Sequence, residues 1–288
     1  MSDTGLTYIH SLVVARILHV SDLHVGTRED AQVAAALVRL AANVRPEVVV
    51  ASGDLTNRGR RDEHERAHAL LESVGVPVVA VPGNHDLPYT FPSRFIAPWR
   101  EFERVWGTTE PTYSSPALHV VGLNSARPYR HQSGGIRDAQ LRSAATRLGE
   151  AKPGAYRVVA LHHHMIGAPW RAARKRPVSR RNHVLAELVT AGADLIVAGH
   201  IHQAAVSERH EFEAVDGDAR AVVVSIAPGL GQPRPRRLGE ARGLQVYEID
   251  AGTLAVDTHI WRGGDWALTA RRSFTVGVAS DALVGRAG

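Results

Sequence analysis

Short apolar runs recur along the chain, and a polar cluster follows each of them at once. Runs of four or five residues that are bounded by turn residues predict buried strands. Five such strands are expected at residues 16–20, 48–52, 78–82, 158–161 and 195–198. The clusters that follow are Asp22-Leu23-His24, Gly53-Asp54, Gly83-Asn84-His85-Asp86, His162-His163-His164 and Gly199-His200-Ile201-His202. Ligands of open α/β sheets bind beyond the carboxyl ends of the strands, so we expect these clusters to meet in one place.

Helical spacing of apolar residues separates the predicted strands. Val33, Ala36, Leu37 and Leu40 give one amphipathic pattern of this kind. Helices are expected at residues 29–43, 61–74, 92–106, 138–151 and 179–191, with a further strand at 118–123. Strands that alternate with helices and are then followed by a run of strands predict two packed sheets with helices outside, an α/β fold.

Beyond His202 the pattern changes. Four runs rich in β-branched residues follow without an intervening helix, at residues 221–226, 244–249, 254–260 and 267–276. They predict antiparallel strands of a second sheet, and the Gly-, Pro- and Arg-rich stretch 228–242 predicts a loop. We expect a single domain over residues 13–276, with loosely ordered tails at 1–12 and 277–288.

The polar clusters supply ligands for metal ions. Seven candidate donors stand in them: Asp22, His24, Asp54, Asn84, His162, His200 and His202. Nitrogen and oxygen donors, in a chain without cysteine, suit Zn, Mn, Fe, Co or Ni. Seven donors are too many for one ion, but with one shared carboxylate they make two four-ligand sites. Two divalent ions about 3.5–4 Å apart suit in-line displacement at phosphorus, which indicates a phosphoester hydrolase.

The order Asp-x-His, Gly-Asp, Gly-Asn-His-Asp, His-His and Gly-His-x-His resembles that of the calcineurin-like metallophosphoesterase superfamily, over residues 16–202. Each motif alone is weak, but five in order after five strands make a specific signal. Gly53-Asp54-Leu55-Thr56 and Asn84-His85-Asp86 are most similar to the bacterial class III cyclic nucleotide phosphodiesterases and their broad-specificity relatives. The resemblance implies a four-layer α-β-β-α sandwich of two mixed β-sheets flanked by helices.

The resemblance also implies a role for each motif residue. Asp22, His24, Asp54 and His202 would hold the first of two divalent ions (Mn, Fe or Zn), and Asp54, Asn84, His162 and His200 would hold the second. Asp54 would bridge the two ions, and a hydroxide between them would be the nucleophile. His85 would be a catalytic residue that is not a ligand and that protonates the leaving oxygen.

The triple histidine leaves an alternative open. The superfamily usually ligates with the first histidine of the pair, which is His162 here, but His163 is a second candidate, as ligand or as a substrate contact. Relatives often carry His-His-Pro-Pro, whereas His164 and Met165 replace the prolines in this chain. The shape of this loop is therefore not implied by the resemblance.

Two further residues have alternative interpretations. Arg58, in Asn57-Arg58-Gly59, resembles the arginine that grips phosphate in phosphoprotein phosphatases, so it is a candidate substrate contact or else a solvated loop residue. Asp86 either orients a neighbouring residue or starts a turn before Pro88. His19 and His119 lie within strand-like runs and are expected to be structural, whereas His131 falls in a loop that could border the site.

Charge adds a candidate rim to this site. The net charge is +5 and the pI is about 9.9. Basic residues cluster after the triple histidine (Arg171, Arg174, Lys175, Arg176, Arg180 and Arg181) and again at Arg234, Arg236 and Arg237. The first cluster would steer anionic phosphoesters, hold nucleic acid or an anionic lipid headgroup, or form a solvated face. No run approaches the length of a transmembrane segment, and no signal peptide is evident, so a cytoplasmic location is expected.

These features favour a phosphodiesterase that acts on cyclic nucleotides or other small diesters. A phosphomonoesterase or a nucleotide-sugar pyrophosphatase could use the same site. A nuclease is possible but not favoured, because superfamily nucleases usually carry a capping region for which this chain has little room. A non-catalytic scaffold would be expected to lack ligands that are all present here. The sequence does not indicate the physiological substrate or the oligomeric state.

Overall fold

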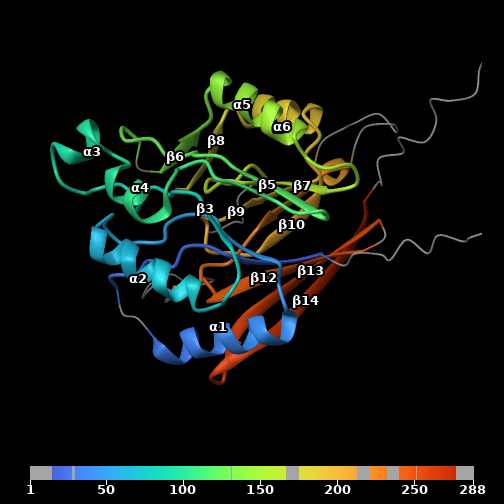
Figure 1. Ribbon diagram of the computed structural model, residues 1–288, viewed down its shortest axis with the longest axis horizontal. Coiled ribbons are helices and arrows are strands. Elements are labelled where there is room, and N and C mark those ends of the chain that lie inside the picture. The colour runs from blue at the N-terminus through green and yellow to red at the C-terminus, as the bar shows by residue number, and fades with distance from the viewer. Residues whose placement is uncertain are drawn as a thin grey trace, which may run out of the picture.

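Two six-stranded mixed β-sheets pack face to face, and helices cover the outer face of each (Figure 1). The computed structural model describes residues 15–27, 30–130, 132–166, 175–212, 221–231, 240–250 and 252–276. The tails expected at 1–12 and 277–288 lie outside these residues, as do His131, Arg171, Arg174 and the arginines at 234, 236 and 237.

The first sheet has the strand order β14-β13-β12-β1-β2-β3. β1, β2 and β3 run parallel, and β12, β13 and β14 form an antiparallel meander that joins β1. Their bounds are β1 Ala15–Val20, β2 Val48–Ala51, β3 Val78–Ala80, β12 Gly243–Asp250, β13 Thr253–Arg262 and β14 Asp265–Thr275. Two long helices, α1 Ala31–Val44 and α2 Arg61–Glu72, make the crossovers between the parallel strands.

The second sheet has the order β10-β11-β9-β7-β5-β4, with a parallel centre and antiparallel edge strands. The bounds are β4 Thr112–Ser114, β5 Leu118–Gly122, β7 Tyr156–Ala160, β9 Leu195–Ala198, β10 Ala205–Glu208 and β11 Val223–Ile226. Its helices are α5 Asp138–Gly149 and α6 Arg181–Thr190, and a 3-10 turn, η1, spans Arg209–Glu211. β6 Ser133–Gly135 and β8 Arg176–Ser179 form a separate parallel pair.

Three apolar cores lie between the four layers, one at each interface. Because strand side chains alternate between faces, Ile17 and Val50 point between the sheets, whereas Leu18 and Val49 point toward α1 and α2. The third core joins α5 and α6 to the outer face of the second sheet. Figure 1 shows these two helix pairs on opposite sides of the sheets. The predicted four-layer α-β-β-α sandwich of two mixed sheets is therefore confirmed.

The prediction that the strands after His202 form a second sheet is wrong. β12 pairs antiparallel with β1, with Tyr247 opposite Ile17, so the meander extends the first sheet. β11 pairs parallel with β9 and belongs to the other sheet. The apolar pattern shows that a strand is buried, but it does not identify the strand beside it.

The single helix predicted over residues 92–106 is also wrong. The segment forms two short helices, α3 Ser93–Ile96 and α4 Arg100–Trp106, with a break at Ala97 and Pro98. A residue that precedes proline is disfavoured in the helical conformation, and Ala97 has φ −143° and ψ 61°. α4 packs against α2 through the fully buried ring of Phe102.

His19 and His119 lie in packed strand layers, as predicted. The ring of His19 hydrogen-bonds with the hydroxyls of Tyr247 and Ser52, at 2.9 and 2.8 Å. Among the described helices, none is long and apolar enough to span a membrane.

Candidate metal centre

The five polar clusters follow β1, β2, β3, β7 and β9, and backbone hydrogen bonds join the loops that carry them. The Asp22 amide donates to the Gly53 carbonyl at 2.9 Å, and the His24 amide donates to that of Asp54 at 3.0 Å. Across the sheets, the His200 amide donates to Asp22 Oδ2 at 2.8 Å. The carboxyl ends of strands from both sheets therefore supply one site.

Backbone strain is concentrated in these loops. Seven non-glycine residues in the described part of the chain have positive φ, and five of them are predicted metal ligands. These five are Asp22 (52°), His24 (49°), Asp54 (51°), His200 (74°) and His202 (56°). Such conformations cost about 1 kcal/mol or more each and persist only where the surrounding structure enforces them, as it often does at functional sites.

Glycines let the loops approach one another. A Cβ atom at Gly199 would lie 1.7 Å from Ser21 Oγ, and one at Gly83 would lie 2.3 Å from Asp54 Oδ1. Any side chain at either position would push a predicted ligand loop away from its neighbour. The glycines of the Gly-Asn-His-Asp and Gly-His-x-His motifs are therefore required by packing.

One group of possible ligand atoms lies on the β1 side of the site. His202 Nε2 is 3.0 Å from Asp22 Oδ1 and 3.3 Å from His24 Nε2, and His24 Nε2 is 3.8 Å from Asp22 Oδ1. Ligand atoms about 2.1 Å from a tetrahedral ion lie about 3.4 Å apart. The spacing of these three side chains therefore fits a common cation.

A second group lies on the β7 side, and Asp54 stands between the two. His162 Nε2 is 3.1 Å from His200 Nδ1 and 3.4 Å from Asp54 Oδ1. The other oxygen of Asp54 is 3.9 Å from His24 Nε2, in the first group. Each oxygen of this carboxylate thus faces a different histidine cluster, which is the arrangement that a bridging ligand needs.

Buried oxygens in the site lack hydrogen-bond donors. Asp22 Oδ1, Asp54 Oδ2 and Asn84 Oδ1 are buried and accept no hydrogen bond from the described residues. Leaving such atoms unpaired costs roughly 1–3 kcal/mol each, so their convergence beside imidazole nitrogens fits a site for cations.

The ionisation of the site also suits metal binding. Burial lowers the pKa of His24 to about 3 and that of His200 well below its usual value, so both are neutral donors. Burial alone would lower the pKa of His162, but the carboxylates of Asp54 and Asp22 outweigh it and raise the pKa to about 9. Burial opposes ionisation of the two aspartates, yet neighbouring histidines hold both pKa values well below the usual range. Metal ligands must be deprotonated, and most of these already are.

The contacts of the triple histidine distinguish its members. His162 Nδ1 lies 2.8 Å from the Ser52 carbonyl oxygen and must donate to it, which directs Nε2 at Asp54 and His200. Metal-ligating histidines usually donate their other nitrogen in this way. The His163 ring hydrogen-bonds with Ser125 Oγ at 2.9 Å and lies 4.5 Å from the His200 ring. His163 thus remains near the cluster, but the geometry supports His162 as the ligand.

His85 borders the cluster without being enclosed by it. Its ring lies 4.8 Å from that of His24, edge to face. Nδ1 is 3.0 Å from the Asn57 carbonyl oxygen and 3.1 Å from the Tyr89 hydroxyl. Because a carbonyl only accepts, Nδ1 carries a hydrogen, and Nε2 is the nitrogen that can exchange a proton with a substrate.

Asp86 joins two of the ligand loops and does not merely start a turn. Its Oδ2 accepts from the amides of Gly83 and Leu55, at 2.7 and 3.2 Å. Its Oδ1 accepts from the amide and the hydroxyl of Thr56, both at 2.9 Å. The carboxylate therefore fixes the loop of Asp54 against the loop of Asn84 and His85.

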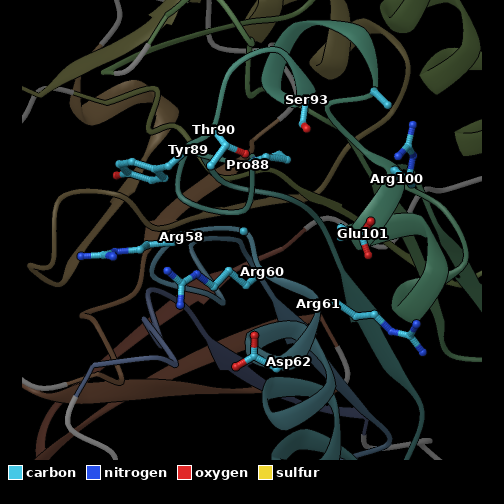
Figure 2. Close-up of a pocket in the computed structure, with 12 residues that line it drawn as sticks. Arg58, Arg60, Arg61, Asp62, Pro88, Tyr89, Thr90, Ser93, Arg100 and Glu101 are labelled. Carbon is cyan, nitrogen blue, oxygen red and sulfur yellow. The ribbon is translucent and has the colours of Figure 1, made fainter.

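Other predicted residues lie at the edge of the site or outside it. Arg58 lines a cavity between residues 58–62 and 88–101, which Tyr89 also lines (Figure 2). In the basic cluster, Lys175 Nζ donates to the His200 carbonyl, whereas Arg180 pairs with Asp138 at 2.8 Å. Sequence reasoning missed Tyr89 and Ser125, because nothing in their local sequence indicates a contact with His85 or His163.

Comparison with known proteins agrees with this geometry. The calcineurin-like phosphoesterase family model matches residues 15–204. The chain therefore belongs to the calcineurin-like phosphoesterase family, as its motifs predicted.

Relatives share the family at modest identity. A probable cyclic nucleotide phosphodiesterase of Rhodococcus erythropolis is 29% identical over 209 residues, which are 65% of this chain and 64% of that protein. A 3',5'-cyclic adenosine monophosphate phosphodiesterase of Haemophilus influenzae is 25% identical over 228 residues, 73% of this chain and 77% of that protein. The chain thus spans a little under two thirds of the Rhodococcus protein.

Solved structures share the fold. The purple acid phosphatase of yellow lupin superposes with a TM-score of 0.65 at 10% identity, over 92% of this chain and 54% of that one. GAP50, the inner membrane complex anchor of Plasmodium, gives 0.60 at 14% identity, over 92% of this chain and 89% of that one. At such identities the likeness concerns the fold alone.

Proposed function

We propose that the chain is a metal-dependent phosphoester hydrolase, and specifically a phosphodiesterase of cyclic nucleotides or other small diesters. The observation that carries this proposal is the position of Asp54, whose two oxygens face separate histidine clusters 3.4 and 3.9 Å away. The names of the Rhodococcus and Haemophilus relatives support cyclic nucleotides as a substrate class.

Two divalent ions, Mn, Fe or Zn, would occupy the site. Asp22, His24 and His202 would hold one, and Asn84, His162 and His200 would hold the other, with Asp54 shared by both. Such a pair of ions lowers the pKa of bound water and neutralises charge at phosphorus. The unpaired buried oxygens of Asp22, Asp54 and Asn84 support these assignments.

His85 would serve as the general acid. Asn57 and Tyr89 hold its Nδ1 side, so Nε2 is left to donate a proton to the oxygen that leaves phosphorus. Asp86 would act through other residues. Its contacts with Gly83 and Thr56 hold the loop of His85 in a fixed position relative to the loop of Asp54.

Elemental analysis and a substrate panel test the proposal. We expect about two transition-metal ions per chain, and hydrolysis of bis(p-nitrophenyl) phosphate and of 3',5'-cyclic AMP faster than of p-nitrophenyl phosphate. Glycerophosphodiesters, nucleotide diphosphate sugars and DNA complete the panel and address the alternatives of pyrophosphatase and nuclease. Metal-loaded protein that hydrolyses none of these esters would refute the proposal. The cytoplasmic location remains a prediction that cell fractionation can test.

A further inference from the structure

A cavity of about 540 Å³ opens between the loop before α2 and the segment that carries α3. Tyr89 lines it and places its hydroxyl 3.1 Å from His85 Nδ1. Arg58, which also lines it, directly follows Asn57, whose carbonyl lies 3.0 Å from the same nitrogen. Tyr89 and Asn57 thus connect the cavity to the Nδ1 side of His85, the residue proposed to protonate the leaving group through Nε2.

The lining of this cavity carries a net positive charge, because its acidic residues are paired with arginines and three of its own arginines are not paired with a carboxylate among the described residues. Four arginines and two acids contribute to it, and both acids are neutralised within their own helices. The pairs are Asp62–Arg66 at 3.1 Å, Glu101–Arg104 at 3.6 Å and, for one of the arginines, Arg61–Glu65 at 2.8 Å. Arg58, Arg60 and Arg100 form no ion pair with a carboxylate in the described part of the chain.

Two of these arginines lie on the side of Tyr89, whose hydroxyl contacts His85. Figure 2 shows Arg58 and Arg60 extending toward the side of the cavity that holds Tyr89, with Arg61 and Arg100 on the opposite side. The buried carboxylate of Glu63 fixes their backbone, since its Oε2 accepts from the amides of Arg58 and Arg60, at 2.8 and 3.3 Å. Their guanidinium groups thus extend from a fixed loop.

We propose that this cavity receives the leaving group and that Arg58 and Arg60 bind a second phosphate on it. The preferred substrate class is then a diester whose leaving alcohol itself carries a phosphate. This inference rests on the proposed function. Water attacks phosphorus and loses a proton to solvent, the bond from phosphorus to the alcohol oxygen breaks, and His85 protonates that oxygen. The products are a phosphomonoester and a phosphorylated alcohol.

Two thymidine dinucleotides test the proposal: TpT, and pTpT, which carries an added 5'-phosphate. If the phosphorylated nucleoside leaves, pTpT yields two molecules of pT, whereas the opposite cleavage yields thymidine and pTp. We expect two pT, and a kcat/KM for pTpT about tenfold or more above that for TpT, the effect of a charge-assisted contact with phosphate. Formation of thymidine and pTp, or equal kcat/KM values, would overturn the proposal.

Variants tie this preference to the cavity. Arg58→Ala/Arg60→Ala should bring the pTpT to TpT ratio close to one, and Arg58→Lys/Arg60→Lys should restore part of it. Arg142→Ala, an exposed arginine of α5, is the matched control and should keep the wild-type ratio. A ratio that the double alanine variant leaves unchanged contradicts the assignment. The substrate panel separates the two claims. Wild-type protein that hydrolyses no ester of the panel refutes the proposed function, whereas hydrolysis of bis(p-nitrophenyl) phosphate without a pTpT preference refutes this inference alone.

Discussion

Replacement of Asp86 tests whether the ligand loops are held together by one buried carboxylate. The side chain is 1% exposed and accepts four hydrogen bonds, three of them from backbone amides. The amides belong to Leu55, Thr56 and Gly83, which lie in the two loops that carry Asp54 and Asn84. In Asp86→Ala these buried donors lose their acceptor.

The expected loss of stability follows from those donors. A buried amide left unpaired costs roughly 1–3 kcal/mol. Burial raises the pKa of Asp86, which shows that enclosing this carboxylate already has a cost that alanine removes. Three donors at the lower end of the range therefore give about 3–5 kcal/mol for Asp86→Ala. The effect of Asp86→Asn should be smaller, about 1–3 kcal/mol, because the amide keeps one acceptor oxygen and leaves about one backbone donor unpaired.

Urea denaturation, fitted with a common slope, measures both variants. Asp62→Ala is the control, since its carboxylate is exposed and forms a surface ion pair with Arg66, and it should lose less than about 1 kcal/mol. Bound metal should also fall, because residues that orient ligands typically contribute about 10–100-fold to metal affinity. A loss below about 1 kcal/mol for Asp86→Ala, or equal losses for the alanine and asparagine variants, would refute this account.

Three further substitutions separate metal binding, chemistry and packing. Asp54→Ala should reduce metal content from about two ions per chain to less than one by elemental analysis, and retention of both ions would exclude a bridging role. His85→Ala should keep its metal while kcat falls about 10²-fold or more, and loss of an ion would show that His85 is a ligand. Phe102→Ala should destabilise the fold by about 3–5 kcal/mol in the same urea assay, because the ring is fully buried between α4 and α2. Phe91→Ala, at a ring 84% exposed, should change stability by less than about 0.5 kcal/mol, and equal effects of the two would contradict the packing argument.

The sequence allowed the layers of the fold to be predicted, but not the pairing of every strand. The buried runs at β1, β2, β3, β7 and β9 were found because apolar length and turn residues mark them. The assignment of β12 to a separate sheet was wrong. β12 pairs with the edge of β1, and neither the sequence of β1 nor that of β12 identifies the other as its neighbour. The break between α3 and α4 could have been predicted from Pro98, which lies inside an otherwise helical pattern.

Some residues of the candidate site could be predicted from the sequence and others could not. Its motif residues could be identified because each follows a strand end, a position that chain order reveals. Tyr89 reaches His85 from four residues further along the chain, and Ser125 reaches His163 from the segment after β5, so only the folded chain brings these partners together. Arg58 was a candidate substrate contact from its motif. Its place in a cavity with Tyr89 could not be predicted, because residues 88–101 form the other wall of that cavity only in the folded chain.

The strained backbone of five predicted ligands indicates that contacts within the protein set the geometry of the site. Five ligand residues with positive φ would relax if their loops were free, since each conformation costs about 1 kcal/mol or more in the folded state. Several are held because their amides and carbonyls are hydrogen-bonded across loops, as in the bonds from the His24 amide to the Asp54 carbonyl at 3.0 Å and from the Asp22 amide to the Gly53 carbonyl at 2.9 Å. Close contacts at Gly83 and Gly199 leave these loops no room to separate. Side chains that are fixed in this way would not need to reorganise if they bound cations, as the proposed function requires.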